Sequence, residues 1–258
     1  AGAAGTVVEN FGVGSSVTIN NNSISIDPTS DLDSSETYHI SYPSGAFTNT
    51  SGDVSYVGTA YTFGVKTYLY QLWAVGRGTV GNLGQNVKDA ARSSPVQIPG
   101  SWSKIGVAGA SVGAINTDGE LWTWGHNWYG TLGQNSRTYY SSPVQVPGTT
   151  WSNISGTTNL TMVALKTDGT LWTWGDATDG ALGNNQTSSQ YSSPIQIPGT
   201  TWGTPFSGGQ AVCGSIKTNG TLWMWGPNDA GLLGQNERTS RSSPIQIPGT
   251  TWSTASTS

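Results

Sequence analysis

The sequence predicts an all-β protein built from repeated units. A short stretch, Leu-Trp-Thr-Trp-Gly, begins at residue 121, returns at 171, and returns again at 222 with Met in place of Thr. A degenerate copy, Leu-Trp-Ala-Val-Gly, begins at residue 72, so successive copies are 49, 50 and 51 residues apart. A fixed period of this length indicates a propeller, a solenoid or another stacked array of small structural units.

A turn signal stands shortly before each full copy of this stretch. Asp-Gly or Asn-Gly pairs occur at 118–119, 168–169 and 219–220. Such pairs favour the two-residue turns of β-hairpins, because their residues tolerate positive φ angles. Each pair should join an apolar incoming strand, at 110–116, 160–166 or 211–217, to an outgoing strand that carries two Trp residues. Because these Trp residues lie two positions apart, they share one face of that strand.

Each unit continues through glycines at fixed offsets. They fall at 76, 81 and 84 in the first unit, and at 125, 130 and 133, at 175, 180 and 183, and at 226, 231 and 234 in the others. This regularity predicts backbone positions with positive φ or close chain approach. The motif Ser-Ser-Pro-(Val/Ile)-Gln-(Val/Ile)-Pro-Gly follows at 93, 141, 192 and 242 and predicts a short strand. A further Trp closes each unit at 102, 151, 202 and 252.

A unit of three or four short strands cannot bury its faces alone. When units stack face to face, both faces of each sheet become core. We therefore expect the repeated Trp residues to be structural core residues, rather than a light-sensing Trp cluster. On this interpretation, truncation of Trp172 destabilises the fold strongly, whereas truncation of Trp128, outside the repeated positions, has a much smaller effect.

These residues resemble the repeats of the regulator-of-chromosome-condensation family, especially its Trp-rich bacterial and phage versions. The family pattern is a turn, a strand that ends in Trp-Gly, spaced glycines with Leu-Gly, and a proline-flanked strand. It is matched three times in full and once in part, over residues 65–258. The units are 65–100, 101–149, 150–200 and 201–250, with the start of a fifth at 251–258.

The resemblance implies a partial or completed β-propeller of about four repeats. Propellers of this family usually close with seven blades. The ring is therefore expected to be an open arc, to be completed by another chain, or to be part of a longer protein.

Residues 1–64 lack the repeat and predict a separate β domain. Alternating apolar and polar residues at 16–20 and 23–27 surround Asn21-Asn22 and predict a hairpin, and further strands are expected at 37–42 and 59–63. The motifs at 25–28, 36–38, 45–47 and 61–63 resemble the C-terminal part of a bacterial Ig-like domain. The resemblance implies a partial Ig-like β-sandwich at 1–64, of the kind found in surface-layer and adhesin-like proteins.

Composition narrows the expected function classes. Only 9% of the residues are charged, and the formal net charge is -4. Phosphate-backbone binding needs clustered Lys and Arg, whereas the basic residues here are scattered, so nucleic acid is not an expected partner. No apolar run approaches the length of a membrane span. The single cysteine, Cys213, is expected to be a small buried side chain.

The residues also predict a protein without catalytic activity. His39 and His126 are the two histidines, and neither stands in a motif with Ser, Cys or a carboxylate at a known spacing. The acidic residues at 27, 31, 33 and 36 match no calcium loop in their spacing, and a solvated acidic loop is the expected interpretation. No cofactor or metal is expected.

Positions at which the repeats differ predict a recognition surface. Variable loops lie at 87–92, 136–140, 186–191 and 237–241. Aromatic and Arg side chains on the loops of a rigid scaffold are typical recognition groups, although ordinary loop variation would give the same pattern. The candidate residues on these loops, and on the loop after the second unit's Trp strand, are Trp128, Tyr129, Arg137, Tyr139, Tyr140, Tyr191, Arg238 and Arg241.

The sequence-based hypothesis is a non-catalytic structural and recognition protein displayed on a surface. Low charge, Trp-rich repeats and an Ig-like companion are similar to tail-fibre, capsid-decoration and adhesin proteins, and among these we favour a bacteriophage virion protein. The expected partners are other structural proteins of a virion or cell surface, and a host-surface glycan or protein. The expected location is the virion surface, or outside the cell on a bacterial surface.

Several alternatives stay open. The chain could be a secreted or cell-surface bacterial adhesin, an inhibitor-like propeller that binds a soluble enzyme, or a guanine-nucleotide exchange factor. It could also be a lectin-like propeller whose Trp128, Tyr129, Tyr139 and Tyr140 stack on sugars. The host, the ligand and the oligomeric state are not fixed by the sequence.

Overall fold

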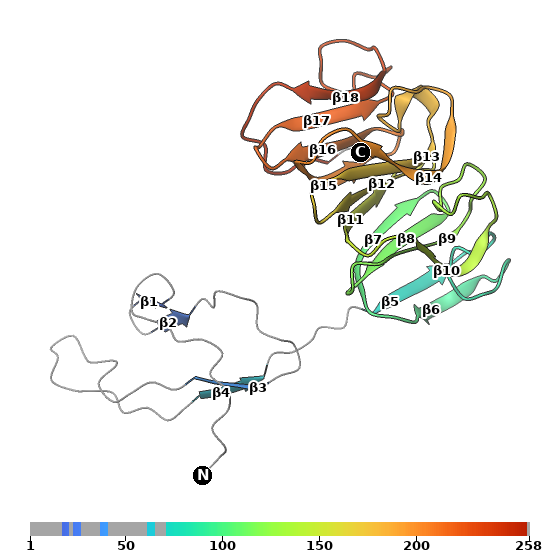
Figure 1. Cartoon of the computed structure of the whole chain (residues 1–258). Helices are drawn as coiled ribbons and strands as arrows, with labels where there is room; N and C mark the ends of the chain where they lie inside the picture. Colours follow the sequence, from blue (N-terminus) through green and yellow to red (C-terminus); the bar gives the residue numbers. More distant parts are fainter. Residues whose placement is uncertain (1–16, 21–22, 27–36, 41–60, 65–70, 257–258) are drawn as a thin grey trace. The chain divides into compact units, whose positions relative to one another are not determined.

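The computed structural model describes residues 17–20, 23–26, 37–40, 61–64 and 71–256 (Figure 1). The chain divides into two compact units, Ala1–Tyr68 and Leu69–Ser258. In the first unit, β1 (Val17–Asn20) pairs antiparallel with β2 (Ser23–Ile26), and β3 (Thr37–Ile40) with β4 (Tyr61–Gly64). The predicted hairpin and the two further strands are confirmed. The acidic residues at 27–36, and most of the segment that resembles an Ig-like domain, lie outside the described residues.

The second unit is a stack of antiparallel sheets, here called blades 1 to 4 in chain order (Figure 1). Blade 1 contains two strands, β5 (Leu72–Gly76) and β6 (Arg92–Ile98). Blade 2 contains β7 (Trp102–Ala108), β8 (Ser111–Asn116), β9 (Leu121–Gly125) and β10 (Tyr140–Val146). Blade 3 contains β11 (Trp151–Gly156), β12 (Thr161–Lys166), β13 (Leu171–Asp176) and β14 (Gln190–Ile197). Blade 4 contains β15 (Trp202–Ser207), β16 (Cys213–Lys217), β17 (Leu222–Gly226) and β18 (Arg241–Ile247).

In every four-stranded blade the strands lie side by side in chain order. The one helical turn in the described residues is the 3₁₀ segment η1 (Thr178–Gly180). None of the described residues forms a helix with the length and apolar character that a membrane span requires. The predicted proline-flanked strands are confirmed as the outer strands β6, β10, β14 and β18.

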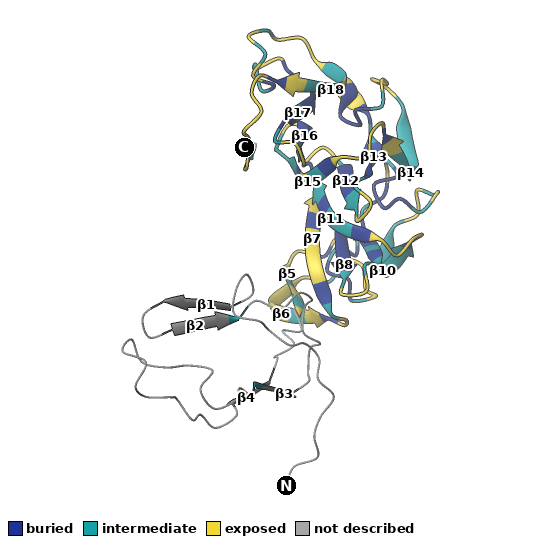
Figure 2. Ribbon diagram, turned by 60° about the vertical axis from the view of Figure 1, so that its left-hand side comes forward, coloured by how far each residue is buried: buried dark blue, intermediate teal, exposed yellow. Residues whose placement is uncertain are grey.

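Neighbouring blades bury their facing surfaces against each other. Leu121 and Ile115 of blade 2 share one buried cluster with Met162 and Trp174 of blade 3. A second cluster joins blades 3 and 4 in the same way, and Figure 2 shows the buried residues along the strands of the stack. The expectation that both faces of a blade become core is therefore confirmed for blade 3, which contacts a four-stranded blade on each side.

The contact between consecutive blades, here called the junction, is built from repeated residues. The second Trp of each full pair donates its indole N–H to a carbonyl oxygen of the preceding blade: Trp124 to Asn82 (3.1 Å), Trp174 to Thr131 (2.8 Å) and Trp225 to Ala181 (3.0 Å). In blades 1, 2 and 3 a backbone N–H donates to the carbonyl oxygen of the first Ser in the Ser-Ser-Pro motif of the following blade: Asn86 to Ser141 (2.7 Å), Asn135 to Ser192 (2.6 Å) and Asn185 to Ser242 (2.6 Å). The residues of the repeat therefore determine how consecutive blades pack together, in addition to how each blade folds.

The two Trp residues of each pair have different environments, which corrects the expectation for Trp172. Trp174 is fully buried, whereas Trp172 is half-buried. Trp172 lies beside the turn at the end of the sheet, where its indole N–H donates to Thr170 Oγ1 (2.9 Å) and Lys166 Nζ lies 4.5 Å from its ring. The second Trp of the pair is therefore the core residue.

The turns before the Trp strands contain three residues, not the two that were predicted. In blade 2, Asn116 N–H donates to the Glu120 carbonyl (3.0 Å), and Gly119 N–H donates to the Asn116 carbonyl (3.2 Å). Gly119 has φ +75°, whereas Asp118 does not enter the positive-φ region. A type I turn followed by one left-handed residue needs a single positive φ, which glycine adopts without strain.

The stack ends differently at blade 1. The described residues of blade 1 form only β5 and β6, which correspond to the last two strands of the other blades. Ile105 and Val107 on the facing strand β7 of blade 2 are each about half exposed (Figure 2). The matching residue of blade 3, Ile154, is buried against Gly106 and Gly113 of blade 2. An atypical first unit was expected, and its Trp73 and Val75 are also exposed.

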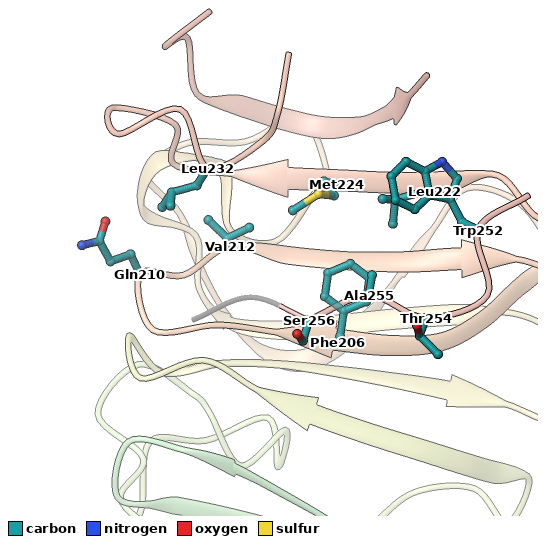
Figure 3. A pocket seen from close by; sticks show the side chains of 10 residues that line it. All are labelled: Phe206, Gln210, Val212, Leu222, Met224, Leu232, Trp252, Thr254, Ala255 and Ser256. Atoms are coloured by element: carbon teal, nitrogen blue, oxygen red, sulfur yellow. The ribbon is translucent and has the colours of Figure 1, made fainter. Parts of the chain in front are cut away.

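At the other end, one face of blade 4 has no further blade against it in the described part of the chain. Phe206, Val212 and Met224 line a cavity of about 370 Å³ on this face, and Trp252 and Ala255 of the following segment border it (Figure 3). Trp252 N–H donates to the Gly220 carbonyl (3.0 Å), which repeats the contact that the closing Trp makes in blades 3 and 4.

Candidate recognition surface

The predicted site residues lie on two features of the second unit. The loop of residues 126–139 in blade 2 carries Trp128, Tyr129, Arg137 and Tyr139. The corresponding loop of blade 4 carries the exposed Arg238. The other three lie at the start of outer strands, at one register position: Tyr140 opposite Gly125, Tyr191 opposite Gly175 and Arg241 opposite Gly226.

The outer-strand register adds one residue that sequence analysis missed. Arg92 lies opposite Gly76 in blade 1, at the position that Tyr140 takes in blade 2. It is exposed, whereas Tyr140 and Tyr191 are half-buried. The four blades therefore carry Arg, Tyr, Tyr and Arg at one equivalent position. Each of these residues directly precedes its Ser-Ser-Pro motif, which was the sequence signal for Arg92.

A buried asparagine holds the blade 2 loop in place. Asn127 is fully buried, its Nδ2 donates to the carbonyls of Ser136 (3.0 Å) and Thr138 (2.8 Å), and its Oδ1 accepts from Leu132 N–H (2.9 Å). Both ends of the side-chain amide are therefore used. Asn228 makes the same set of contacts in blade 4. Sequence analysis missed both residues, although Gly-x-Asn after the Trp strand was a usable signal.

Trp128 follows this anchor directly and is the most exposed large apolar side chain in the described residues, at 64%. Arg137 is also exposed, and Tyr129 is half-buried. Because Asn127 fixes the backbone on one side, the loop presents Trp128 without having to order itself on binding. Such preorganisation lowers the conformational entropy that a binding loop loses.

Tyr139 is more constrained than Trp128. Its ring lies 4.8 Å from the His126 ring, centroid to centroid, at 49°. Lys88 of blade 1 places its Nζ 5.9 Å from the Tyr139 ring centroid. Partial burial lowers the pKa of His126, so the neutral imidazole is favoured at this contact.

Arg241 differs from the other predicted residues because it already has a partner. Its guanidinium forms an ion pair with the carboxylate of Glu237 in the same loop, and the side chain is half-buried. A binding partner would have to displace this carboxylate or bind beside it. We therefore place the centre of the candidate surface on blade 2, around Trp128.

The candidate surface offers aromatic faces and cationic donors rather than an arrangement of catalytic groups. Within the described ranges, no three His, Cys, Asp or Glu side chains gather closely enough to hold a metal ion. Cys213 is fully buried, as expected, and burial raises the pKa of its thiol, which disfavours the reactive thiolate.

Comparison with protein families identifies the repeat. Residues 118–164 and 168–214 match the model of the Regulator of chromosome condensation (RCC1) repeat. Each match runs from the hairpin turn of one blade to the second strand of the next, and the two matches begin 50 residues apart, which is the spacing of the repeated Trp stretches. The chain therefore carries RCC1-type repeats. No curated protein sequence gives a significant match to the chain.

Solved structures with 16–20% sequence identity share the fold. The match to human WBSCR16 (20% identity, TM-score 0.57) covers 68% of this chain and 47% of the WBSCR16 chain. The match to Prp20p from Saccharomyces cerevisiae (18% identity, TM-score 0.59) covers 70% of this chain and 47% of the Prp20p chain. That structure was described together with the binding properties of Prp20p to Gsp1p and histones. Yeast RCC1 (Prp20) in complex with Kap60 (16% identity, TM-score 0.57) covers 74% and 52%. This chain thus spans about half of each of these proteins, and its fold is β-propeller-like.

Proposed function

We propose that this chain is a non-catalytic protein-recognition module that a bacteriophage displays on its virion, as a tail-fibre or capsid-decoration protein. The observation that carries recognition is Trp128, 64% exposed on a loop that the buried Asn127 orders. Exposed aromatic residues on rigid supports are the side chains that most often dominate the binding energy of protein interfaces.

Comparison within the chain shows that the fold does not require an aromatic residue at this position. Thr178 in blade 3 and Asp229 in blade 4 occupy the place of Trp128 after the Trp strand. Both are exposed, and both belong to complete four-stranded blades. Trp128 therefore adds apolar contact area to the surface at a position where the fold of the blade does not need an aromatic side chain, which supports a binding role.

A protein partner is supported by the RCC1-type repeats and by the fold relatives. Prp20p was described with its binding to Gsp1p and histones, and also in complex with Kap60. Display on a virion is supported by the low charge of 9%, the abundance of small polar residues, and the resemblance to Trp-rich phage repeats. A propeller scaffold serves many roles, so the partner is set by the loops.

The proposal is tested by density-gradient separation of native phage material, with mass spectrometry used to locate the chain. The expected result is that the chain bands with intact particles at a fixed copy number. If the chain stays in the soluble fraction, virion display is wrong, and a secreted or cell-surface adhesin, lectin or inhibitor becomes the leading function. A gradient of particles assembled without this chain is the control for non-specific adsorption.

A further inference from the structure

Two lysines in the second unit are held between pairs of Trp rings. Lys166 Nζ lies 4.7 Å from the Trp151 ring centroid and 4.5 Å from that of Trp172. In blade 4, Lys217 Nζ lies 4.3 Å from the ring centroids of both Trp202 and Trp223. These distances are typical of cation–π contacts, in which the negative face of the ring attracts the ammonium group.

The two sites have the same construction. The Trp rings stand nearly perpendicular, at 74° with centroids 6.4 Å apart in blade 3, and at 78° and 6.1 Å in blade 4. Each ammonium nitrogen lies 3.9 Å from the position that a Cβ atom would take on the glycine before the closing Trp, Gly148 or Gly199. The repeat therefore builds an ammonium site at a fixed place in the blade.

Blade 2 has the Trp residues of this site but not its lysine. In the pairing of the first two strands, Trp151 lies opposite Lys166 and Trp202 opposite Lys217, whereas Trp102 lies opposite Asn116. The second Trp of the site is also present, because Trp122 occupies the register position of Trp172 and Trp223. The shorter asparagine cannot reach the place of the missing ammonium group.

A cavity of about 670 Å³ opens at this place between blades 1 and 2. Its lining includes both Trp residues, Asn116, and Gly100, the counterpart of Gly148. None of the residues that line it is basic, and Asp118 contributes a carboxylate. In blades 3 and 4 the same place is taken by the ammonium groups of Lys166 and Lys217.

Blade 2 also adds a second negative charge. Glu120 Oε2 accepts hydrogen bonds from Asn116 Nδ2 (2.8 Å) and from Trp122 Nε1 (3.3 Å). The sister blades have threonines at this position, and their hydroxyls accept the same indole N–H. Glu120 does not line the cavity itself, but its carboxylate is hydrogen-bonded to Asn116 and Trp122, which do. A carboxylate in place of a hydroxyl increases the attraction for a cation at this place.

We propose that this cavity binds the lysine side chain of a partner polypeptide. The ammonium group would lie between Trp102 and Trp122 beside Glu120, and its alkyl stem would cross the lip of the cavity from blade 1. Lysine fits better than arginine, because the chain itself places lysine in the two matching sites, and a compact ammonium differs from a planar guanidinium in shape. The proposal concerns a site distinct from Trp128 and does not depend on display by a virion.

The test follows the indole N–H signals of the isotope-labelled full chain by NMR while ligands are added. The probes are the peptide acetyl-Gly-Lys-Gly-amide, the same peptide with norleucine, and n-butylammonium. The lysine peptide is expected to shift the Trp102 and Trp122 signals in a saturable way, and the uncharged norleucine peptide to bind about fivefold more weakly or worse. Equal binding of both peptides, or binding of n-butylammonium with exclusion of the lysine peptide, would overturn the proposal.

Two variants that copy sister residues control for loss of folding. Asn116→Lys supplies the missing lysine from within the chain and is expected to abolish the shifts caused by the peptide. Glu120→Thr is expected to weaken binding severalfold while the blade stays folded, because Thr170 and Thr221 occupy this position in intact blades. The fully buried Trp174 reports folding through an unchanged indole signal. If Asn116→Lys leaves the peptide titration unaltered, the site is not the one proposed.

Discussion

Trp174→Ala is expected to lower the free energy of unfolding by about 3–5 kcal/mol. Trp174 is fully buried, and it packs against Ile115 and Leu121 of the preceding blade. Its removal leaves a cavity at the junction of blades 2 and 3. It also leaves the Thr131 carbonyl without the indole N–H that lies 2.8 Å away, and an unsatisfied buried acceptor adds to the loss.

Urea unfolding followed by far-ultraviolet circular dichroism measures this loss. Trp128→Ala is the matched control, because it removes the same number of atoms from an exposed site and is expected to change stability by about 0.5 kcal/mol or less. If the two variants lose equal stability, either Trp128 is structural or Trp174 is not in the core, and the assignment of the two Trp classes fails.

Gly130→Ala is expected to cost about 2–5 kcal/mol, from two separate sources. Gly130 has φ +78°, a region that costs an L-residue about 1–2 kcal/mol. The added Cβ would also lie 2.5 Å from Ser192 Cα in the next blade, and backbone atoms cannot move aside as a flexible side chain can. Overpacking of this kind costs about 1–3 kcal/mol more.

The chain provides its own control for the first source. Gly231 occupies the equivalent position in blade 4, has the same φ of +78°, and would have nothing within 4 Å of an added Cβ. Gly231→Ala is therefore expected to cost only the conformational part, about 1–2 kcal/mol. Equal losses for the two variants, measured by the same urea titration, would mean that the junction between blades 2 and 3 is not closely packed at Gly130.

The blade and its stacking could be predicted from the sequence because each residue pattern that the blade needs occurs several times along the chain. The turn glycines, the Trp strand and the Ser-Ser-Pro strand occur at fixed offsets, and each offset corresponds to a contact in the structure. All twelve glycines at the repeated positions after the Trp strands have positive φ, as their spacing predicted. A constraint that acts once per blade leaves a periodic trace that a single sequence is enough to reveal.

What could not be predicted depends on contacts between distant residues. Trp174 is buried because it packs against the preceding blade, whereas Trp172 lies beside the turn at the end of the sheet, and strand periodicity does not distinguish these two places. The role of Asn127 depends on carbonyls 9 and 11 residues away in a loop of irregular shape. The site that lacks a lysine became visible only when strand pairing placed Asn116 opposite Trp102.

The candidate surface was predicted as a set of residues rather than as a place. Sequence variation pointed to the loops of blade 2, and the structure shows that Trp128 on one of them is exposed. It could not show that Arg241 is paired with Glu237. Loop residues that look alike in sequence thus differ in how free they are to bind.

We propose that the blade 2 loop around Trp128 is the recognition surface. Its most direct test is photo-crosslinking from native particles in which a benzoyl-phenylalanine residue replaces Trp128, compared with particles in which it replaces the equivalent exposed residue Thr178 of blade 3. Position 128 is expected to crosslink to one defined partner protein, and position 178 is expected to give no crosslink. Crosslinks of equal yield from both positions, or from position 178 alone, would contradict it.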